Sequence, residues 1–297
     1  MNATRPMGLV DPKGIKSIGL AYATSKKIGE IDPIVKSFLF DLKNPWAFWI
    51  ELNSTHPLIA KRIKRLNDIQ KLKCFDFEEM ERVEIDKSRL YAGFFKDLFI
   101  SLLPYISFFS MLILLVFLLI DIIPFISITS STIFLLFLLS FPAALGISLV
   151  IKGLYKYPKG KAVKTNVLEL LGDVYASPVK GKYVSLSGKL IGRGIPGLII
   201  SEDMMLQDET GIIFMNYEGL IPGISNIIFA MMKMDKLIGK SVRVKGWFLR
   251  GASPRIEVDE MLLLDEDKKI KSYLRFWAIF IGILLMAMSL ILAMLFI

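Results

Sequence analysis

The sequence predicts a multi-pass α-helical membrane protein with an N-terminal α-helical segment and a small all-β barrel, both in the cytoplasm. Apolar residues make up 54% of the chain and its mean hydropathy is positive, which exceeds the usual composition of a soluble domain. Several apolar runs are long enough to cross ~30 Å of hydrocarbon, which takes about 20 helical residues. In the second half of the chain, apolar and polar residues alternate between turn residues, as is typical of strands.

The N-terminal segment has the spacing of helices. Residues 14–27 repeat apolar side chains at helical intervals, and Pro33 is placed to open a second helix over 34–42. A third helix is expected from Pro57, after two candidate N-cap residues. Its apolar residues form one stripe and its basic residues lie largely off that stripe, which is typical of a solvated basic face. A charged linker follows over residues 74–97.

Three membrane helices are predicted, at residues 98–120, 133–151 and 277–297. In its longest form the second begins at Ile122. Prolines inside the first two are tolerated, because neighbouring groups in a membrane protein satisfy the freed carbonyls. Residues 1–30 lack the basic start and the continuous apolar core of a cleaved signal peptide, so insertion is expected to begin at the first of these helices.

The net charge of +9 is concentrated beside the predicted membrane helices. Residues 152–165 hold five lysines and no acid, and residues 268–297 hold four basic residues, whereas the loop 121–132 holds none. Positive charge marks the cytoplasmic side of membrane helices. The pattern therefore places the N-terminal segment and the barrel in the cytoplasm and the C-terminus outside. The single cysteine, Cys74, rules out a disulfide framework within the chain.

Strand signals begin after a basic linker at residues 152–179. Five strands are expected, and an apolar, Met-rich segment after the third is expected to form a helix. Five strands with a helix after the third resemble the OB fold, a small Greek-key barrel. The strands are placed at 184–190, 204–207, 212–217, 242–248 and from 256, with the helix at 224–237.

An OB barrel often binds single-stranded nucleic acid on aromatic rings within a basic groove. The candidate rings here are Tyr183, Phe214, Tyr217 and Trp247. Residues 166–267 carry 11 basic and 14 acidic side chains, a net charge of −3, whereas a groove that follows phosphates should be basic. The charge argues against nucleic-acid binding and favours the rings as core or protein-contact residues.

The only histidine of the chain, His56, lies in the stretch NPWAFWIELNSTHPLIAKRIKRL. A zinc hydrolase of the H-E-x-x-H type needs two imidazoles one helical turn apart, with the intervening Glu as general base. One histidine does not supply two ligands. The sequence therefore predicts that no zinc site of this kind is formed by this chain alone.

The string from Ser54 to Pro57, with Arg62 six residues after the histidine, resembles the S-T-H-P…R-I…L signature of HtpX-like membrane zinc metallopeptidases. The similarity covers roughly residues 5–70. It implies that His56 lies close to a zinc ion without binding it and stabilises the tetrahedral oxyanion. It also implies that Arg62 anchors the segment by pairing with an acid. Zinc would be the cofactor only where a partner chain supplies the ligands, and the substrate would be a protein or peptide.

In that family the H-E-x-x-H helix and the third ligand, a Glu, precede the S-T-H-P segment, and this chain holds neither. Three explanations for the missing zinc ligands remain open: a gene split in two, a truncated start, and a degenerate remnant of the peptidase. The expectation is a C-terminal part or subunit of a membrane metalloendopeptidase that is inactive alone and acts in membrane-protein quality control. The alternative is a non-enzymatic, membrane-anchored OB-fold protein that mediates protein association, comparable to small membrane OB proteins that partner with stomatin-like scaffolds.

The predicted organisation has six regions in chain order. The metallopeptidase-like helical segment comes first, two of the regions are membrane-embedded, and the barrel precedes the last membrane helix. Their bounds are 1–73 for the helical segment, 74–97 for the charged linker, 98–151 for a two-helix membrane hairpin, 152–179 for the basic linker, 180–267 for the barrel and 273–297 for the last membrane helix.

Overall fold

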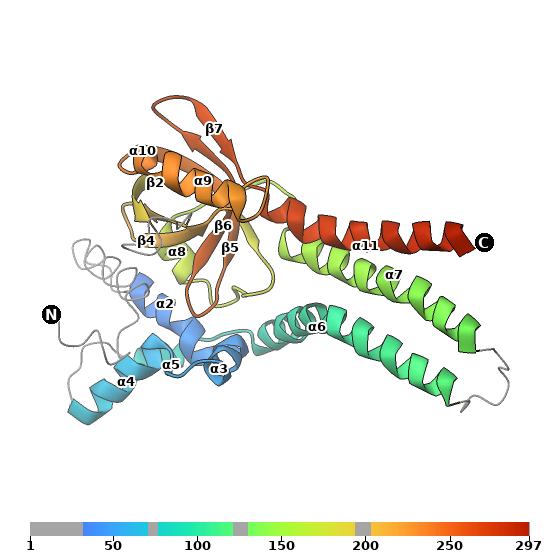
Figure 1. The fold of residues 1–297 in the computed structure, drawn as a ribbon. Helices are drawn as coiled ribbons and strands as arrows, with labels where there is room; N and C mark the ends of the chain where they lie inside the picture. Colours follow the sequence, from blue (N-terminus) through green and yellow to red (C-terminus); the bar gives the residue numbers. More distant parts are fainter. Residues whose placement is uncertain (1–31, 71–76, 121–129, 194–202, 297) are drawn as a thin grey trace. The chain divides into compact units, whose positions relative to one another are not determined.

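The computed structural model describes residues 32–70, 77–120, 130–193 and 203–296. The chain divides into two compact units (Figure 1). The larger comprises Met1–Phe94 and Pro158–Leu274, and the smaller comprises Phe95–Tyr157 and Arg275–Ile297. The helix predicted over 14–27 and the thiol of Cys74 lie outside the described residues.

Three helices in the described part of the chain are long and apolar enough to cross a membrane: α6 (Lys87–Leu119), α7 (Ser130–Lys156) and α11 (Leu274–Phe296). Each contains most of one predicted apolar run, but α6 begins at Lys87 within the predicted charged linker and α7 continues to Lys156 within the predicted basic linker, because a helix does not end where its apolar stretch ends. Between α7 and α11, Gly146 and Gly282 face each other so closely that a Cβ on either would lie 2.6 Å from the carbonyl oxygen of the other. Such small-residue contacts let membrane helices approach each other at backbone distance.

The larger unit contains a closed barrel of five strands, as the sequence predicts. Each of the five is hydrogen-bonded to two other barrel strands, and among these pairings only that of β4 with β6 is parallel. Around the barrel the order is β2, β3, β4, β6, β5 and back to β2. The strands are β2 (Lys182–Arg193), β3 (Met204–Gln207), β4 (Ile212–Asn216), β5 (Ser241–Leu249) and β6 (Arg255–Leu263).

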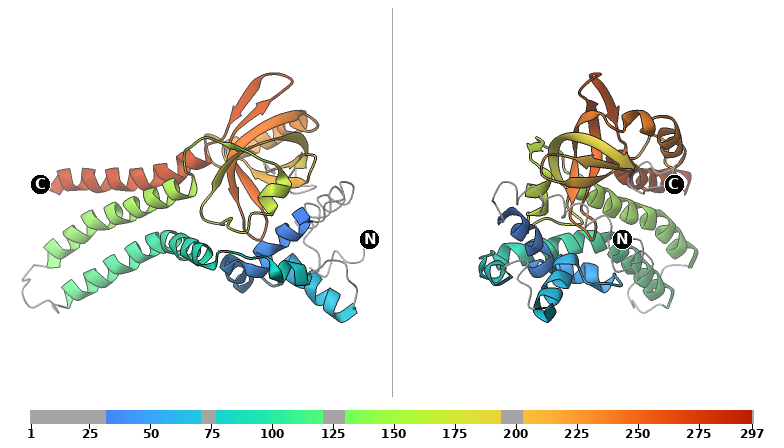
Figure 2. Two further views of the ribbon diagram at one scale, coloured as in Figure 1. Left: turned by 180° about the vertical axis from the view of Figure 1, so that it is seen from behind. Right: turned by 90° about the vertical axis from the view of Figure 1, so that its left-hand side faces the viewer.

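The barrel core follows from the alternation of apolar residues along each strand, because successive side chains point to opposite faces. Val184 and Leu186 of β2 are buried together with Val244 of β5. The predicted helix between the third and fourth barrel strands is present as α9 (Ile224–Met232) and α10 (Met234–Leu237), which pack against the barrel (Figure 2).

Gly246 sits where β5 shifts register against β6, and we expect Gly246→Ala to destabilise the barrel. An added Cβ would lie 2.4 Å from the backbone oxygen of Glu257 on β6. A backbone atom within the sheet cannot move aside cheaply, so the free energy of unfolding should fall by about 1–3 kcal/mol. Chemical denaturation of the full chain measures the change. Gly251→Ala is the matched control, because its Cβ would have no neighbour closer than 3.9 Å, and equal losses for both variants would contradict the argument.

Some short elements were not anticipated from the sequence. Strand β1 (Val163–Lys164) pairs in parallel with β2 inside the predicted basic linker, and the short helix α8 (Val167–Leu171) follows it. Strand β7 (Lys268–Lys271) extends the sheet from β6 within the basic stretch before α11. Lysine is common on edge strands because its charge discourages pairing with other chains. A lysine-rich edge strand therefore lacks the apolar alternation by which a strand is predicted from sequence.

The described residues before α6 form four helices: α2 (Asp32–Lys43), α3 (Pro45–Leu52), α4 (Ile59–Gln70) and α5 (Phe77–Arg82). Helix α2 covers the residues expected at 34–42, and α4 begins two residues after Pro57. Buried residues of α2, α4 and α5 share one apolar cluster with Val174, which follows α8. Its buried members are Phe38, Leu39, Ala60, Phe77, Met80 and Val174.

Candidate functional site

The segment that carries the S-T-H-P signature begins at a well-defined helix start. The side-chain oxygen of Asn44 accepts a hydrogen bond from Trp46 N at 2.8 Å, and Pro45 occupies the first turn of α3. Asparagine as N-cap followed by proline is a favoured helix start, because one orphan N–H gains a partner and proline has none to lose. The amide of Asn44 also donates to Val174 O at 2.7 Å, which fixes α3 to the segment that leads into the barrel.

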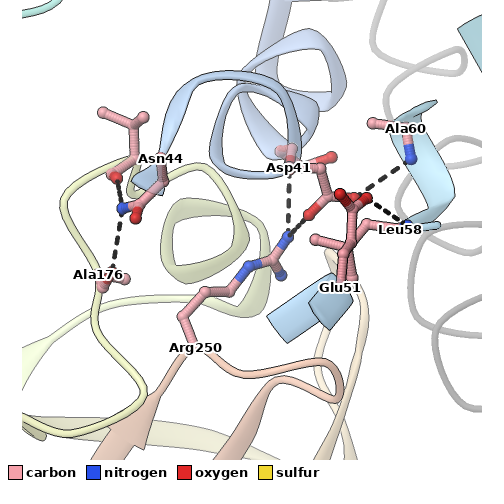
Figure 3. Close-up of polar contacts among 9 residues, drawn as sticks. Asp41, Asn44, Glu51, Leu58, Ala60, Ala176 and Arg250 are labelled. Atoms are coloured by element: carbon pink, nitrogen blue, oxygen red, sulfur yellow. Dashed lines mark hydrogen bonds and ion pairs between the residues drawn. The ribbon is translucent and has the colours of Figure 1, made fainter. Parts of the chain in front are cut away.

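Two carboxylates hold the start of α4 (Figure 3). Glu51 accepts a hydrogen bond from Leu58 N at 2.9 Å, and Asp41 accepts one from Ala60 N at 3.2 Å. The first N–H groups of a helix lack intrahelical partners, and negative charge there also interacts favourably with the helix dipole. The loop between α3 and α4 is therefore tied down by side chains from α2 and α3.

His56 lies on this loop and is exposed to solvent. The hydroxyl of Ser54 donates to His56 O at 2.9 Å and accepts from His56 N at 3.3 Å, so the backbone around the histidine is held in a compact turn. Arg62 lies half-buried in the first turns of α4. Its neighbour Lys61 forms an ion pair with Glu51, at 2.6 Å. Of the two signature residues, His56 thus lies on the loop before α4 and Arg62 lies in α4 itself.

No group of three or more His, Cys, Asp or Glu side chains within the described ranges is arranged to hold a metal ion. Structural and catalytic zinc sites need at least three protein ligands. A zinc ion beside His56 would therefore require ligands from outside those ranges.

A buried ion pair joins the helical segment to the barrel, and sequence reasoning did not identify it. Arg250, at the end of β5, is 4% exposed, and Asp41 of α2 is 6% exposed. Arg250 Nη2 lies 3.4 Å from Asp41 Oδ1 and donates to Ser37 O at 3.2 Å (Figure 3). The guanidinium also lies 5.0 Å from the centroid of the Phe40 ring. No local pattern signals this pair, because its members are 209 residues apart.

The pair is held at an electrostatic cost. Burial raises the pKa of Asp41, and the positive charge of Arg250 offsets part of that rise. Burial likewise lowers the pKa of Arg250, and the charge of Asp41 offsets part of that fall. The Nε of Arg250 has no hydrogen-bond partner in the part of the chain that the structure describes. The net stability that such a pair supplies is small, but removing one member is costly because it leaves the other charge buried without its partner.

The four aromatic residues considered as nucleic-acid platforms make contacts within the larger unit. Trp247 is buried and its indole N–H donates to Pro158 O at 2.8 Å. The hydroxyl of Tyr183 donates to Asp259 at 2.7 Å, and its ring lies 5.3 Å from that of Trp247. Phe214 is buried, and the ring of Tyr217 stacks on an aromatic ring of α9. These rings are accounted for by packing and internal hydrogen bonds.

A polar cavity of about 360 Å³ lies on the barrel surface. Its charged lining is balanced, with Lys164 and Arg243 against Asp208 and Glu209. Asp208 is engaged in structure, because it accepts hydrogen bonds from Val167 N and Gly211 N, both at 2.8 Å. The cavity has no excess of positive charge of the kind that phosphate recognition uses.

The HtpX-like resemblance rests on the signature residues and not on a likeness over the whole chain. In the structure Ser54 to Pro57 occupy an exposed, hydrogen-bonded loop before α4, and Arg62 lies half-buried in α4. No family model, no curated protein and no solved structure matches the chain.

Proposed function

We propose that this chain is the membrane-anchored part or subunit of an HtpX-like zinc metalloendopeptidase, inactive alone, that presents His56 to a zinc site completed by ligands from elsewhere. The observation that supports the proposal best is the loop itself. His56 is exposed, while the carboxylates of Glu51 and Asp41 fix the end of its loop at the start of α4. An exposed residue on a fixed loop is suited to completing a site on another surface.

The chemistry expected of His56 is electrostatic. Attack of water on a peptide carbonyl places negative charge on the carbonyl oxygen, and a positioned donor stabilises that charge. Zinc would polarise the same carbonyl and lower the pKa of its bound water when its ligands are supplied. In this proposal His56 donates a hydrogen bond to the oxyanion, and Arg62 positions the loop by pairing with an acid of the completed site.

A neighbouring apolar patch favours contact with another polypeptide. Phe48, Trp49 and Leu52 are exposed on α3, directly before the loop that carries His56. Contiguous exposed apolar residues mark interaction sites, and aromatic residues are enriched in the centres of such interfaces. We propose that this patch contacts the polypeptide segment that bears the metal ligands.

The orientation in the membrane belongs to the same proposal. The basic residues beside α7 and α11, and the absence of Lys and Arg from the predicted loop 121–132, favour a cytoplasmic helical segment and barrel, with the C-terminus outside. The protein substrate would then be a membrane protein reached from the cytoplasmic side.

Purification of the complex from native membranes in mild detergent, followed by mass spectrometry and zinc analysis, tests the proposal. We expect a co-purifying H-E-x-x-H polypeptide and about one zinc ion per complex. The purified single chain should show no chelator-sensitive proteolysis, which is the control. A complex without zinc and without such a partner would overturn the proposal. It would then favour the alternative of a non-enzymatic, membrane-anchored protein that mediates protein association.

A further inference from the structure

Helix α9 and the loop before it display an apolar surface that the barrel does not cover. Most of its large side chains are about half or more exposed, from 49% for Ile228 to 66% for Met232. This exceeds the scattered apolar residues that are normal on soluble proteins. We name these residues the α9 face: Leu220, Ile221, Ile224, Ile227, Ile228, Met231 and Met232.

The opposite side of the helix is committed to the barrel. Phe229 and Ala230 are buried, and so is Met234 at the start of α10. The ring of Phe229 stacks on Tyr217, with centroids 4.1 Å apart. The helix cannot turn to bury its outer side without exposing these residues, so the α9 face is a fixed outer surface.

Hydrogen bonds tie α9 to the residues directly before α11. The backbone oxygen of Glu218 accepts from Tyr273 N at 2.8 Å, and its N–H donates to the Ser272 hydroxyl at 3.1 Å. Its carboxylate accepts from the side chain of Asn226, in the first turn of α9, at 2.9 Å. Helix α11 begins at Leu274, the next residue after Tyr273. The residues that lead into α9 are therefore bonded to the residues that lead into α11.

The size and charge of α9 fit a lipid surface. Its nine residues span about 14 Å, so the helix is short enough to lie within the headgroup region along its whole length. Lys233 and Lys236 follow the helix and are exposed, while Asp235 between them pairs with Arg193 at 2.8 Å. An apolar helix face bordered by lysines is the pattern of helices that lie in the headgroup region of anionic membranes.

We infer that α9 lies in the plane of the membrane–water interface, with the α9 face inserted among the lipids. The occupant of this surface is the bilayer that α11 crosses, because the residues that lead into α9 are hydrogen-bonded to those directly before α11 and lysines follow the apolar face. The inference requires only that α11 spans a membrane and does not depend on the peptidase proposal. It adds that the barrel is held against the membrane by α9, which restrains its rotation about the α11 tether.

The test uses the full chain in vesicles of phosphatidylcholine and phosphatidylglycerol. Cys74→Ser removes the only cysteine, and Ile228→Cys then carries an environment-sensitive NBD fluorophore on the α9 face. Insertion by about 5–10 Å should let lipids with a nitroxide near the headgroup end of the acyl chain quench about half of the emission. Glu209→Cys, on the exposed turn between β3 and β4, is the matched control and should stay unquenched with the emission of a water-exposed probe.

Two results would overturn the inference. A water-like emission at position 228, unaffected by the nitroxide lipids, would place the α9 face in solvent. A blue-shifted but unquenched emission would mean that protein covers the face, either a second copy or another chain. Because residue 228 is exposed, its substitution should leave the fold intact, and the circular dichroism of both labelled variants verifies this.

Discussion

Arg250→Met is expected to lower the free energy of unfolding of the larger unit by about 3–5 kcal/mol, because it leaves the Asp41 carboxylate buried without its charged partner. Methionine keeps most of the apolar stem, so the loss reflects the missing charge and its hydrogen bonds to Asp41 and Ser37 more than lost packing. Urea denaturation of the full chain in detergent, followed by tryptophan fluorescence, measures the change.

Two matched variants separate charge from structure. The double variant Asp41→Asn, Arg250→Met removes both charges and keeps an oxygen for Ala60 N, so it should regain most of the lost stability. Lys182→Ala breaks an ion pair with Asp173 whose lysine side chain is 47% exposed, and it should cost at most about 1 kcal/mol. If Lys182→Ala were as damaging as Arg250→Met, the central place of the buried pair would be refuted.

The loss in Arg250→Met should also depend on pH. Burial raises the pKa of Asp41, and the variant lacks the positive charge that offsets this rise. The folded state then holds the proton more tightly than the unfolded state, so this contribution favours folding at low pH and disappears as the pH rises through the raised pKa. The destabilisation relative to wild type should therefore be smaller at about pH 5 than at about pH 8. A pH-independent loss would mean that Asp41 stays charged or gains another partner.

The barrel could be predicted from sequence because its information is local. The alternation of apolar and polar residues predicts the second strand at 204–207, where β3 is found. The apolar segment predicted as a helix at 224–237 forms α9 and α10. Helix α3 was missed because its apolar residues form no single stripe. Its Trp46 and Ala47 are buried while Phe48 and Trp49 are exposed, so apolar residues lie on both its buried and its exposed sides and show no helical periodicity.

The arrangement of the candidate site was less accessible from sequence. The signature string identified the loop of His56, but nothing in it indicates that Asp41 caps α4 or that this carboxylate meets Arg250. Both contacts depend on the docking of helices onto a barrel that follows much later in the chain. Docking of this kind is set by tertiary packing and has no period in the sequence.

His56→Gln in the intact, zinc-containing complex is expected to lower kcat about 10²–10³-fold, the usual effect of losing one oxyanion donor. Glutamine is close to histidine in size, but its flexible amide is not held at the position of the ring N–H. The exposed position of His56 makes a folding defect an inadequate explanation for the loss. Zinc content and the amount of co-purifying partner should stay unchanged, because the family resemblance places His56 beside the metal and not among its ligands.

Arg65→Gln provides the control for His56→Gln, since Arg65 is an exposed basic residue on the following helix. It should leave kcat near the wild-type value while changing the local charge by the same or a greater amount. Equal activity losses in the two variants would assign the effect to the charge of the surface. A zinc loss in His56→Gln would instead make His56 a ligand, contrary to the role proposed. A donor aimed at the developing oxyanion requires two results together. The kcat must fall while zinc is retained, and the fall must occur in His56→Gln but not in Arg65→Gln.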